Sequence, residues 1–112
     1  MTGHSGLAET PQTLTIGNDD GFEVTIVALG AAIASLRVPM GNNQREAVLG
    51  YPSLAGYQDD TFYMGATVGR YANRIANATV EITDDRVTLD ANEGPHCLHG
   101  GADGLSRQRW SL

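Results

Sequence analysis

The segment T-L-T-I-G-N-D-D-G-F-E-V-T-I-V, residues 13–27, decides the fold class of this 112-residue chain. Apolar and polar residues alternate on both sides of a Gly-Asn-Asp-Asp-Gly centre at 17–21. Such alternation is typical of half-buried strands, because successive side chains of a strand point to opposite faces. Asn, Asp and Gly tolerate positive φ and favour a tight turn. The segment therefore predicts a β-hairpin with strands at 14–16 and 22–26.

The chain after this hairpin also has the composition of short strands. Residues 27–38 are mostly apolar, but Gly30 and the β-branched residues around it favour two strand pieces joined at a bend over a helix. A Pro-, Gly- and Asn-rich stretch at 39–43 predicts a loop, and residues 46–49 predict another strand. These short strands, separated by turns, predict an all-β sandwich.

The second half of the chain contains one more hairpin and a long glycine-rich stretch. Residues 51–57 predict turns with one short helical turn, and residues 79–89 predict a hairpin whose turn carries Asp84 and Asp85. From residue 91 onward the glycines predict loop. At 110–112 an apolar strand begins at the end of the sequence, so we expect a truncated domain.

Composition excludes several classes of partner. The net charge is −6, and the seven basic residues are scattered, so we expect no nucleic acid partner. The sequence contains no apolar run of membrane-spanning length, so we expect no membrane partner. Cys97 is the single cysteine, which excludes an internal disulfide and fits a reducing compartment. Residues 1–12 are polar and lack the pattern of a signal peptide, so we expect a flexible leader and a cytoplasmic location.

Two segments contain the residues best suited to bind a ligand. The first, G-A-T-V-G-R-Y-A-N-R-I-A-N at 65–77, places Asn73 and Arg74 side by side. Arginine offers a rigid fork of donors and asparagine both a donor and an acceptor, and a sugar hydroxyl can use both. The alternative is a structural arginine paired with one of the 13 carboxylates, or an asparagine that closes a loop.

The second segment, N-E-G-P-H-C-L-H-G-G at 92–101, places His96 and His99 in a loop where glycines allow close approach of a ligand. The alternative for either histidine is a bond to a backbone group. A metal site is disfavoured, because two histidines flanking Cys97 would be cramped and no second ligand group follows. An acid/base pair at Asp59-Asp60 is also disfavoured, because adjacent carboxylates cannot lie on opposite sides of a substrate. The aromatic residues could form a platform for a sugar face or pack in the core; they are Tyr51, Tyr57, Phe62, Tyr63 and Tyr71.

Together these segments resemble the aldose 1-epimerase (galactose mutarotase) family. Residues 65–77 are similar to the first motif of that family, L-H-G-G at 98–101 is similar to the second, and Asn92 fits the lead-in to the second. The resemblance extends over almost all of the chain after Leu14. Two small departures are His96, where the family commonly has asparagine, and Leu105, where it commonly has phenylalanine.

The resemblance implies a fold, a reaction and a set of sugar-binding residues. The fold is a large antiparallel β-sandwich of the galactose mutarotase type, of which residues 13–112 form the N-terminal part. The reaction interconverts α and β anomers of aldoses of the glucose or galactose class, without a cofactor, by acid/base opening of the ring. Asn73, Arg74 and His99 would bind sugar hydroxyls, with possible support from Arg70 and His96. The proton-donating histidine and the glutamate base are expected beyond Leu112.

Two other interpretations remain open from the sequence. One is a carbohydrate-binding module without catalytic activity. The other is an inactive fragment that cannot fold, since half of a sandwich loses much of its apolar burial. The sequence alone does not indicate the oligomeric state.

Overall fold

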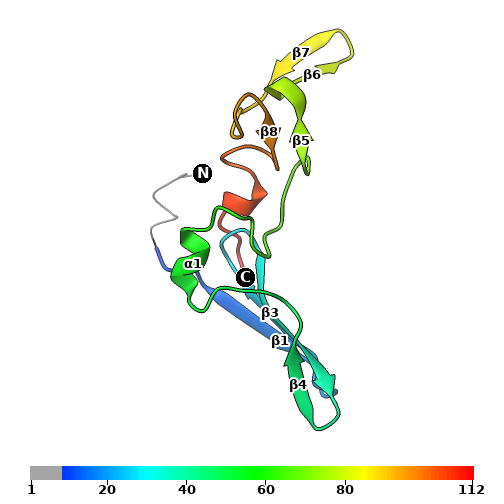
Figure 1. Ribbon diagram of the computed structural model, residues 1–112, viewed down its shortest axis with the longest axis vertical. Helices are drawn as coiled ribbons and strands as arrows, with labels where there is room; N and C mark the ends of the chain where they lie inside the picture. The colour runs from blue at the N-terminus through cyan, green and yellow to red at the C-terminus, as the bar shows by residue number, and fades with distance from the viewer. Residues whose placement is uncertain (1–8) are drawn as a thin grey trace.

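The computed structural model describes residues 9–112, and it consists mainly of short antiparallel strands (Figure 1). The main sheet has the order β1-β2-β3-β4, and two smaller sheets pair β5 with β8 and β6 with β7. The strands are β1 Thr13–Gly17, β2 Glu23–Val27, β3 Ala32–Met40, β4 Asn43–Glu46, β5 Arg74–Ile75, β6 Thr79–Ile82, β7 Asp85–Thr88 and β8 Cys97–Leu98. The helical elements are α1 Leu54–Gln58 and two 3₁₀ turns, Ala76–Ala78 and Leu105–Arg107. The prediction of an antiparallel all-β fold is confirmed.

The first hairpin forms as the alternating pattern predicts. β1 pairs with β2 in regular register from Thr13 opposite Val27 to Gly17 opposite Glu23. Asn18 closes the turn, because its side-chain oxygen accepts hydrogen bonds from the backbone N–H groups of Asp20 and Phe22, both at 3.1 Å. The predicted bend after β2 is also present, with Gly30 at φ +71° between β2 and β3.

The prediction for residues 39–49 is wrong in its boundaries. β3 continues through Pro39 to Met40, and β4 begins at Asn43, so the expected loop at 39–43 is a tight turn. The strand expected at 46–49 lies instead at Asn43–Glu46. The reason is the pairing of β3 with β4, from Met40 opposite Asn43 to Arg37 opposite Glu46, which no local pattern reveals.

The second hairpin is confirmed, with Val80 opposite Val87, and its turn at Thr83 and Asp84 ends where Asp85 begins β7. The expectation of loop from residue 91 onward missed β8. At the end of the chain, the backbone N–H of Trp110 donates to the carbonyl of Ala28 at 2.8 Å. The segment predicted to begin a strand at 110–112 thus starts beside the chain between β2 and β3.

Residues 1–8 of the predicted leader lie outside the described residues. The rest of that segment contacts the fold: Pro11 is buried, and the carbonyl of Gln12 accepts a hydrogen bond from the backbone N–H of Ala28 at 2.8 Å.

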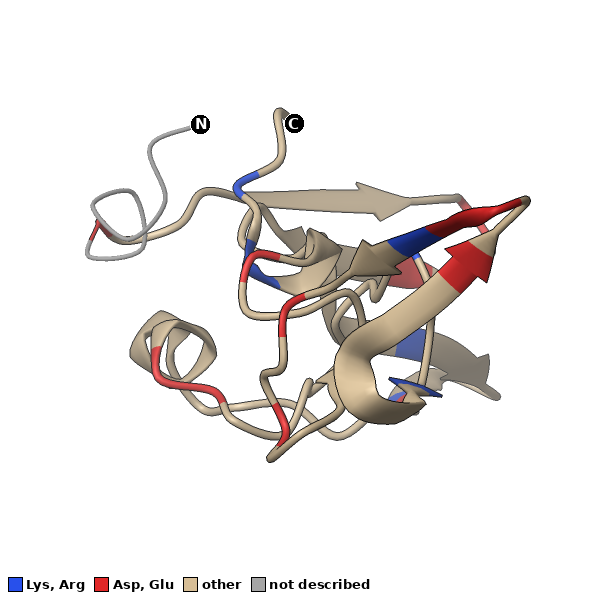
Figure 2. Cartoon of the chain, turned by 90° about the horizontal axis from the view of Figure 1, so that it is seen from above, with Lys and Arg blue, Asp and Glu red and all other residues tan. Residues whose placement is uncertain are grey.

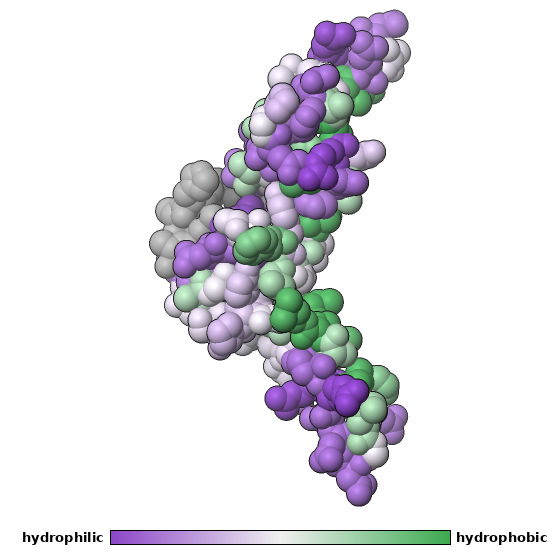
Figure 3. Space-filling view, viewed as in Figure 1, coloured by the Kyte–Doolittle hydropathy of each residue, from purple (hydrophilic) through white to green (hydrophobic). Residues whose placement is uncertain are grey.

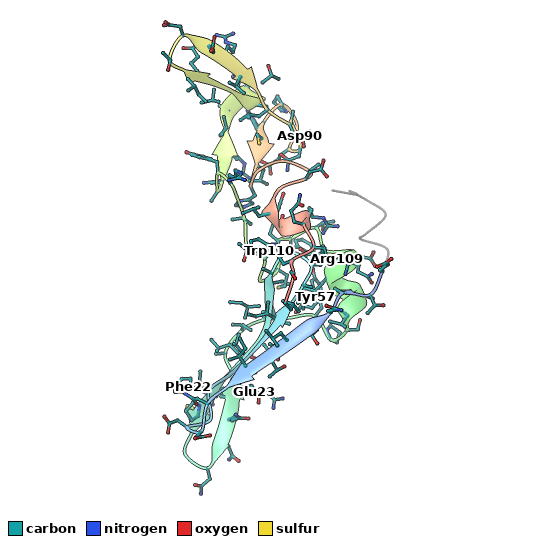
Figure 4. All side chains as sticks on the ribbon, turned by 180° about the vertical axis from the view of Figure 1, so that it is seen from behind. Phe22, Glu23, Tyr57, Asp90, Arg109 and Trp110 are labelled. Carbon is teal, nitrogen blue, oxygen red and sulfur yellow. The ribbon has the colours of Figure 1, made fainter. Side chains whose placement is uncertain are left out.

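The core is small and lies where α1 covers one end of the main sheet. Val27, Leu29, Ala32 and Tyr57 form this cluster, and each is at most 4% exposed. Figure 4 shows Tyr57 on α1 close to the middle of the long molecule, near Arg109 and Trp110. The molecule measures 58 × 29 × 22 Å, and its radius of gyration is 16.8 Å. A compact domain of this length would have a radius of gyration of about 13 Å. The fold is therefore extended, with a small core relative to its surface.

Candidate functional site

A two-residue ladder between β5 and β8 brings the two ligand-binding segments together. Arg74 lies opposite Leu98 and Ile75 opposite Cys97. The ladder continues one residue further, where the backbone N–H of His99 donates to the carbonyl of Asn73 at 2.9 Å. Asn73 and His99 are 26 positions apart in sequence and become neighbours here.

The hydrogen bonds fix the orientation of the His99 ring and its proton. Nδ1 of His99 accepts a hydrogen bond from the backbone N–H of Asn73 at 2.9 Å. A neutral imidazole that accepts at Nδ1 carries its proton on Nε2. The ring of Tyr63 packs edge-on against the His99 ring, with 4.6 Å between the ring centroids. His99 thus presents an N–H donor at Nε2 from a ring held on two sides.

Arg74 is held by Asn73 and Glu93. Nε and Nη2 of Arg74 both donate to the carboxylate of Glu93, the second bond measuring 2.9 Å, and Nη1 donates to Oδ1 of Asn73 at 3.1 Å. Because arginine has only donors, it is the oxygen of the Asn73 amide that faces it, and the NH₂ group points the other way. The Arg74 and Glu93 side chains remain 54% and 40% exposed, so a ligand can reach this cluster.

The pairing of Arg74 with Glu93 shifts both pKa values in opposite directions. The hydrogen bond from Arg74, followed by a smaller effect of its charge, lowers the pKa of the Glu93 carboxyl. The bond to Glu93, and then the charge of that carboxylate, raise the pKa of the Arg74 guanidinium. Both groups are therefore charged at neutral pH, and together they present a cation, a carboxylate and neutral donors.

Asn92 and His96 hold the loop that carries Glu93. The side chain of Asn92 donates to the carbonyl of Leu98 at 2.9 Å and accepts from the N–H of Leu98 at 2.7 Å. Nδ1 of His96 accepts from the backbone N–H of Asn77 at 3.0 Å. His96 thus makes the backbone bond that the sequence left open as its alternative role, and supports the site from the side.

Glycines in the second motif allow the two segments to pack backbone against backbone. A Cβ on Gly100 would lie 1.9 Å from the carbonyl oxygen of Gly69, and one on Gly104 would lie 2.6 Å from the carbonyl oxygen of His99. The close approach expected for a ligand is at these positions an approach of the first motif. Asn73 and His99 themselves adopt positive φ, +67° and +50°, which is uncommon outside glycine and is concentrated at functional sites.

The structure brings together three of the five predicted site residues and places the other two at the edge. Asn73, Arg74 and His99 form one hydrogen-bonded cluster, whereas His96 lies behind it and Arg70 lines a neighbouring groove of about 690 Å³. The sequence did not identify Glu93 as the partner of Arg74. The alternative of a structural arginine contained part of the answer, because Arg74 does pair with one of the carboxylates.

Asp60 has a structural role. Its carboxylate accepts hydrogen bonds from the Tyr51 hydroxyl and from the backbone N–H groups of Phe62 and Met64, both at 3.1 Å. The bond to Asp60 is the main cause that raises the pKa of Tyr51 to about 12. These bonds fix the loop before the first motif and agree with the low weight given to Asp59-Asp60 as an acid/base pair.

Two searches of the described residues bear on metals and membranes. Within residues 9–112, His, Cys, Asp and Glu form no group of three that could hold a metal ion. The same part of the chain has no helix of the length and apolar character that a bilayer crossing requires.

Comparison with known proteins relates the whole described fold to one family. The family model of aldose 1-epimerase matches residues 12–112. The chain is 42% identical over 100 residues to an aldose 1-epimerase of Escherichia coli (strain K12), which covers 88% of this chain and 29% of that protein. It superposes on the crystal structure of a GalM/aldose epimerase homologue from C. elegans with a TM-score of 0.82 and 36% identity, over 90% of this chain and 31% of that one.

A galactose 1-epimerase from Lactobacillus acidophilus NCFM gives a TM-score of 0.77 at 25% identity, over 89% of this chain and 29% of that one. The chain therefore spans less than a third of the relatives it matches. With a family model matching nearly its full length, it belongs to the aldose 1-epimerase family.

Proposed function

We propose that this chain supplies the sugar-holding part of an aldose 1-epimerase, which interconverts the α and β anomers of free aldoses. The main support is the cluster of Asn73, Arg74 and His99, which the β5–β8 ladder joins from two distant segments. Such a set of directed, exposed groups suits a neutral polyol, whose hydroxyls donate and accept hydrogen bonds in fixed directions.

Each side chain has a distinct role in this proposal. Nε2–H of His99 and the NH₂ group of Asn73 donate to sugar oxygens. The carboxylate of Glu93 accepts from a sugar hydroxyl while it holds the Arg74 guanidinium in place. The positive charge of Arg74 stabilises negative charge that develops on a sugar oxygen when the ring opens.

The proton transfers are assigned to groups that this chain does not supply. A base removes the proton of the anomeric hydroxyl, and an acid protonates the ring oxygen. The ring then opens, the C1–C2 bond rotates, and closure on the other face gives the other anomer. Proton transfer accounts for all of this chemistry, so the proposal includes no cofactor. Family resemblance places the acid, a histidine, and the base, a glutamate, beyond Leu112.

The proposed substrates are aldoses of the glucose and galactose class. The name of the Lactobacillus acidophilus relative, galactose 1-epimerase, supports galactose.

Calorimetry with galactose and glucose tests the sugar-holding role. We expect saturable binding to the chain that is lost in Arg74→Ala and in His99→Ala. Arg86→Ala is the matched control, because Arg86 pairs with Glu81 on the distant β6–β7 hairpin. Absence of binding to the unmodified chain at millimolar sugar, or an equal loss in the Arg86 variant, would contradict the proposal.

Polarimetry of fresh α-galactose tests where the acid and base lie. We expect no acceleration of mutarotation by the 112-residue chain alone. Clear acceleration would place both groups within this chain and overturn the assignment.

A second candidate function is a carbohydrate-binding module without catalysis. It is favoured by the fact that every contact of the cluster comes from residues of this chain. It predicts sugar binding together with inactivity even when the chain is joined to the rest of a family sandwich. An inactive fragment, by contrast, would give no cooperative transition in a circular-dichroism melt.

A further inference from the structure

The four-stranded sheet has two chemically different faces. The strand register places Thr15, Thr25 and Ser35 on one face, together with Glu23 and Arg37. At one end of this face α1 packs over the core. The register places the apolar residues of the strands on the other face; they are Leu14, Ile16, Val24, Ile26, Ile33, Leu36, Val38 and Met40.

The apolar face is open along much of its length. Ile16 is 52% exposed, Met40 50% and Ile33 41%. A groove of about 240 Å³ lies on this face between Ile16, Phe22, Val24 and Leu36. Single exposed apolar residues are ordinary on protein surfaces, but a contiguous apolar sheet face marks an interaction site.

A second apolar surface lies beyond the middle of the molecule. The groove of about 690 Å³ is lined largely by apolar side chains from the smaller sheets and the loops near them, including Ile75, Val80, Leu89 and Leu105. Hydrophobic residues recur along the concave side of the bent molecule in Figure 3, over both regions. The excess of the radius of gyration over that of a compact domain agrees with a surface shaped to receive another body.

We propose that this concave apolar surface docks a β-rich polypeptide that corresponds to the part of the aldose 1-epimerase sandwich outside the matched region. The fold superposes on the C. elegans homologue with a TM-score of 0.82 yet covers only 31% of that chain. A sheet with one apolar face requires a second layer, and a sandwich supplies it face to face. The proposal rests on the proposed function and names the partner that would complete its site.

Charge argues against a second copy of this chain as the occupant. Acidic residues concentrate towards both ends of the molecule, at Asp19 and Asp20 in one turn and at Asp84 and Asp85 in the other. Figure 2 shows the acidic residues of the β6–β7 hairpin, and Figure 4 places Glu23 at the opposite end. Two copies packed through this face would bring like-charged ends together in either orientation, at a total charge of twice −6.

Co-expression of two polypeptides tests this docking. The full 112-residue chain, carrying an affinity tag, is produced with the part of the E. coli aldose 1-epimerase outside the matched 100 residues. We expect a stable one-to-one complex by size-exclusion chromatography with light scattering. Ile16→Asp and Phe22→Ser should each weaken it at least about tenfold, because each removes apolar burial from the interface.

Thr15→Asp is the matched control, because Thr15 neighbours Ile16 on β1 and lies on the opposite face. It should leave the affinity within about twofold. Circular dichroism of each variant alone checks that the fold is intact. Absence of a complex on co-expression, or equal weakening by Thr15→Asp, would overturn the proposal.

A homodimer that Ile16→Asp dissociates would also overturn it, in favour of a second copy. The complex is measured without sugar, and sugar binding is measured on the chain alone. A failure of docking and a failure of the sugar-holding role are therefore distinguished.

Discussion

The four-stranded sheet and the cluster around His99 are built in different ways. β1, β2 and β3 are joined by ladders of five residue pairs each, which repeat one backbone pattern. The cluster has a ladder of only two pairs, and the rest of it depends on single bonds from side chains to backbone, such as those of Asn92 and His99. The sheet is therefore determined by a repeated pattern, and the cluster by individual contacts that neighbouring residues cannot replace.

Removal of core packing should have the largest effect and act on the sheet end. Leu29→Ala leaves a cavity beside Val27 and Tyr57, since Leu29 is only 2% exposed, and should cost about 2–5 kcal/mol. Leu49→Ala makes the same chemical change at a residue that is 76% exposed and should cost less than about 0.5 kcal/mol. Urea unfolding followed by circular dichroism measures both. Equal costs would refute the location of the core.

A methyl group between the two motifs should disrupt the cluster and leave the sheet intact. Gly100→Ala places a Cβ 1.9 Å from the carbonyl oxygen of Gly69, with φ at +89°, and should cost about 2–4 kcal/mol. Gly94→Ala also meets a positive φ, +55°, but no atom within 4 Å, and should cost about 1 kcal/mol.

Amide NMR spectra of the two glycine variants identify the region affected. Changes in Gly100→Ala should centre on Asn73 and His99 and spare β1 and β2. If the two variants have the same stability and sugar affinity, the tight contact between the motifs is not present.

Loss of the charge on Glu93 should have a smaller effect, confined to Arg74. Glu93→Gln weakens the two bonds that hold the guanidinium, so the Arg74 Nε–H resonance should exchange faster with water. Sugar affinity should fall by up to about fivefold, the range expected for an exposed ion pair. Glu81→Gln breaks the exposed pair with Arg86, 3.1 Å long, and is the control. An unchanged Arg74 resonance in Glu93→Gln would show that Glu93 does not position Arg74.

The smallest effect should appear on acidification. Because the pKa of Glu93 is lowered in the fold, its pairing with Arg74 contributes fully above the ordinary carboxyl value of 4.5 and is lost as the pH falls through the lower folded value. Sugar binding should therefore be constant from pH 7 to about 5 and decline below that. A carboxyl NMR titration should give a higher pKa for Glu93 in Arg74→Ala than in the unmodified chain. Identical titrations would exclude the pairing.

Local sequence patterns predicted the parts of the fold that depend on local chemistry. The hairpin at 13–27 and the bend at Gly30 form as expected, because alternation and turn residues act over a few positions. The boundaries of β4 were wrong, since a Pro- and Gly-containing stretch resembles a loop until its pairing with β3 is known. β8 was missed for the same reason: two residues have no recognisable period, and only β5 makes them a strand.

The candidate site was predicted in its members and only partly in its connections. Asn73, Arg74 and His99 were identified through motifs similar to those of a family. Glu93 was not, because a carboxylate beside a turn glycine has many possible partners in sequence and only one in space. The assignment of Arg70 as support has no direct contact with the cluster among the described residues, and His96 supports it through the backbone of Asn77.

The sequence by itself determined that this chain forms short antiparallel strands and carries the two motifs of the aldose 1-epimerase family. Hydrophobic alternation and turn chemistry are local, and motifs are read position by position. Only the tertiary structure decided that Glu93 holds Arg74, that His99 donates through Nε2, and that one sheet face is left apolar and open. Those features depend on distances between residues far apart in the chain, which are fixed only when strand register and backbone contacts are formed.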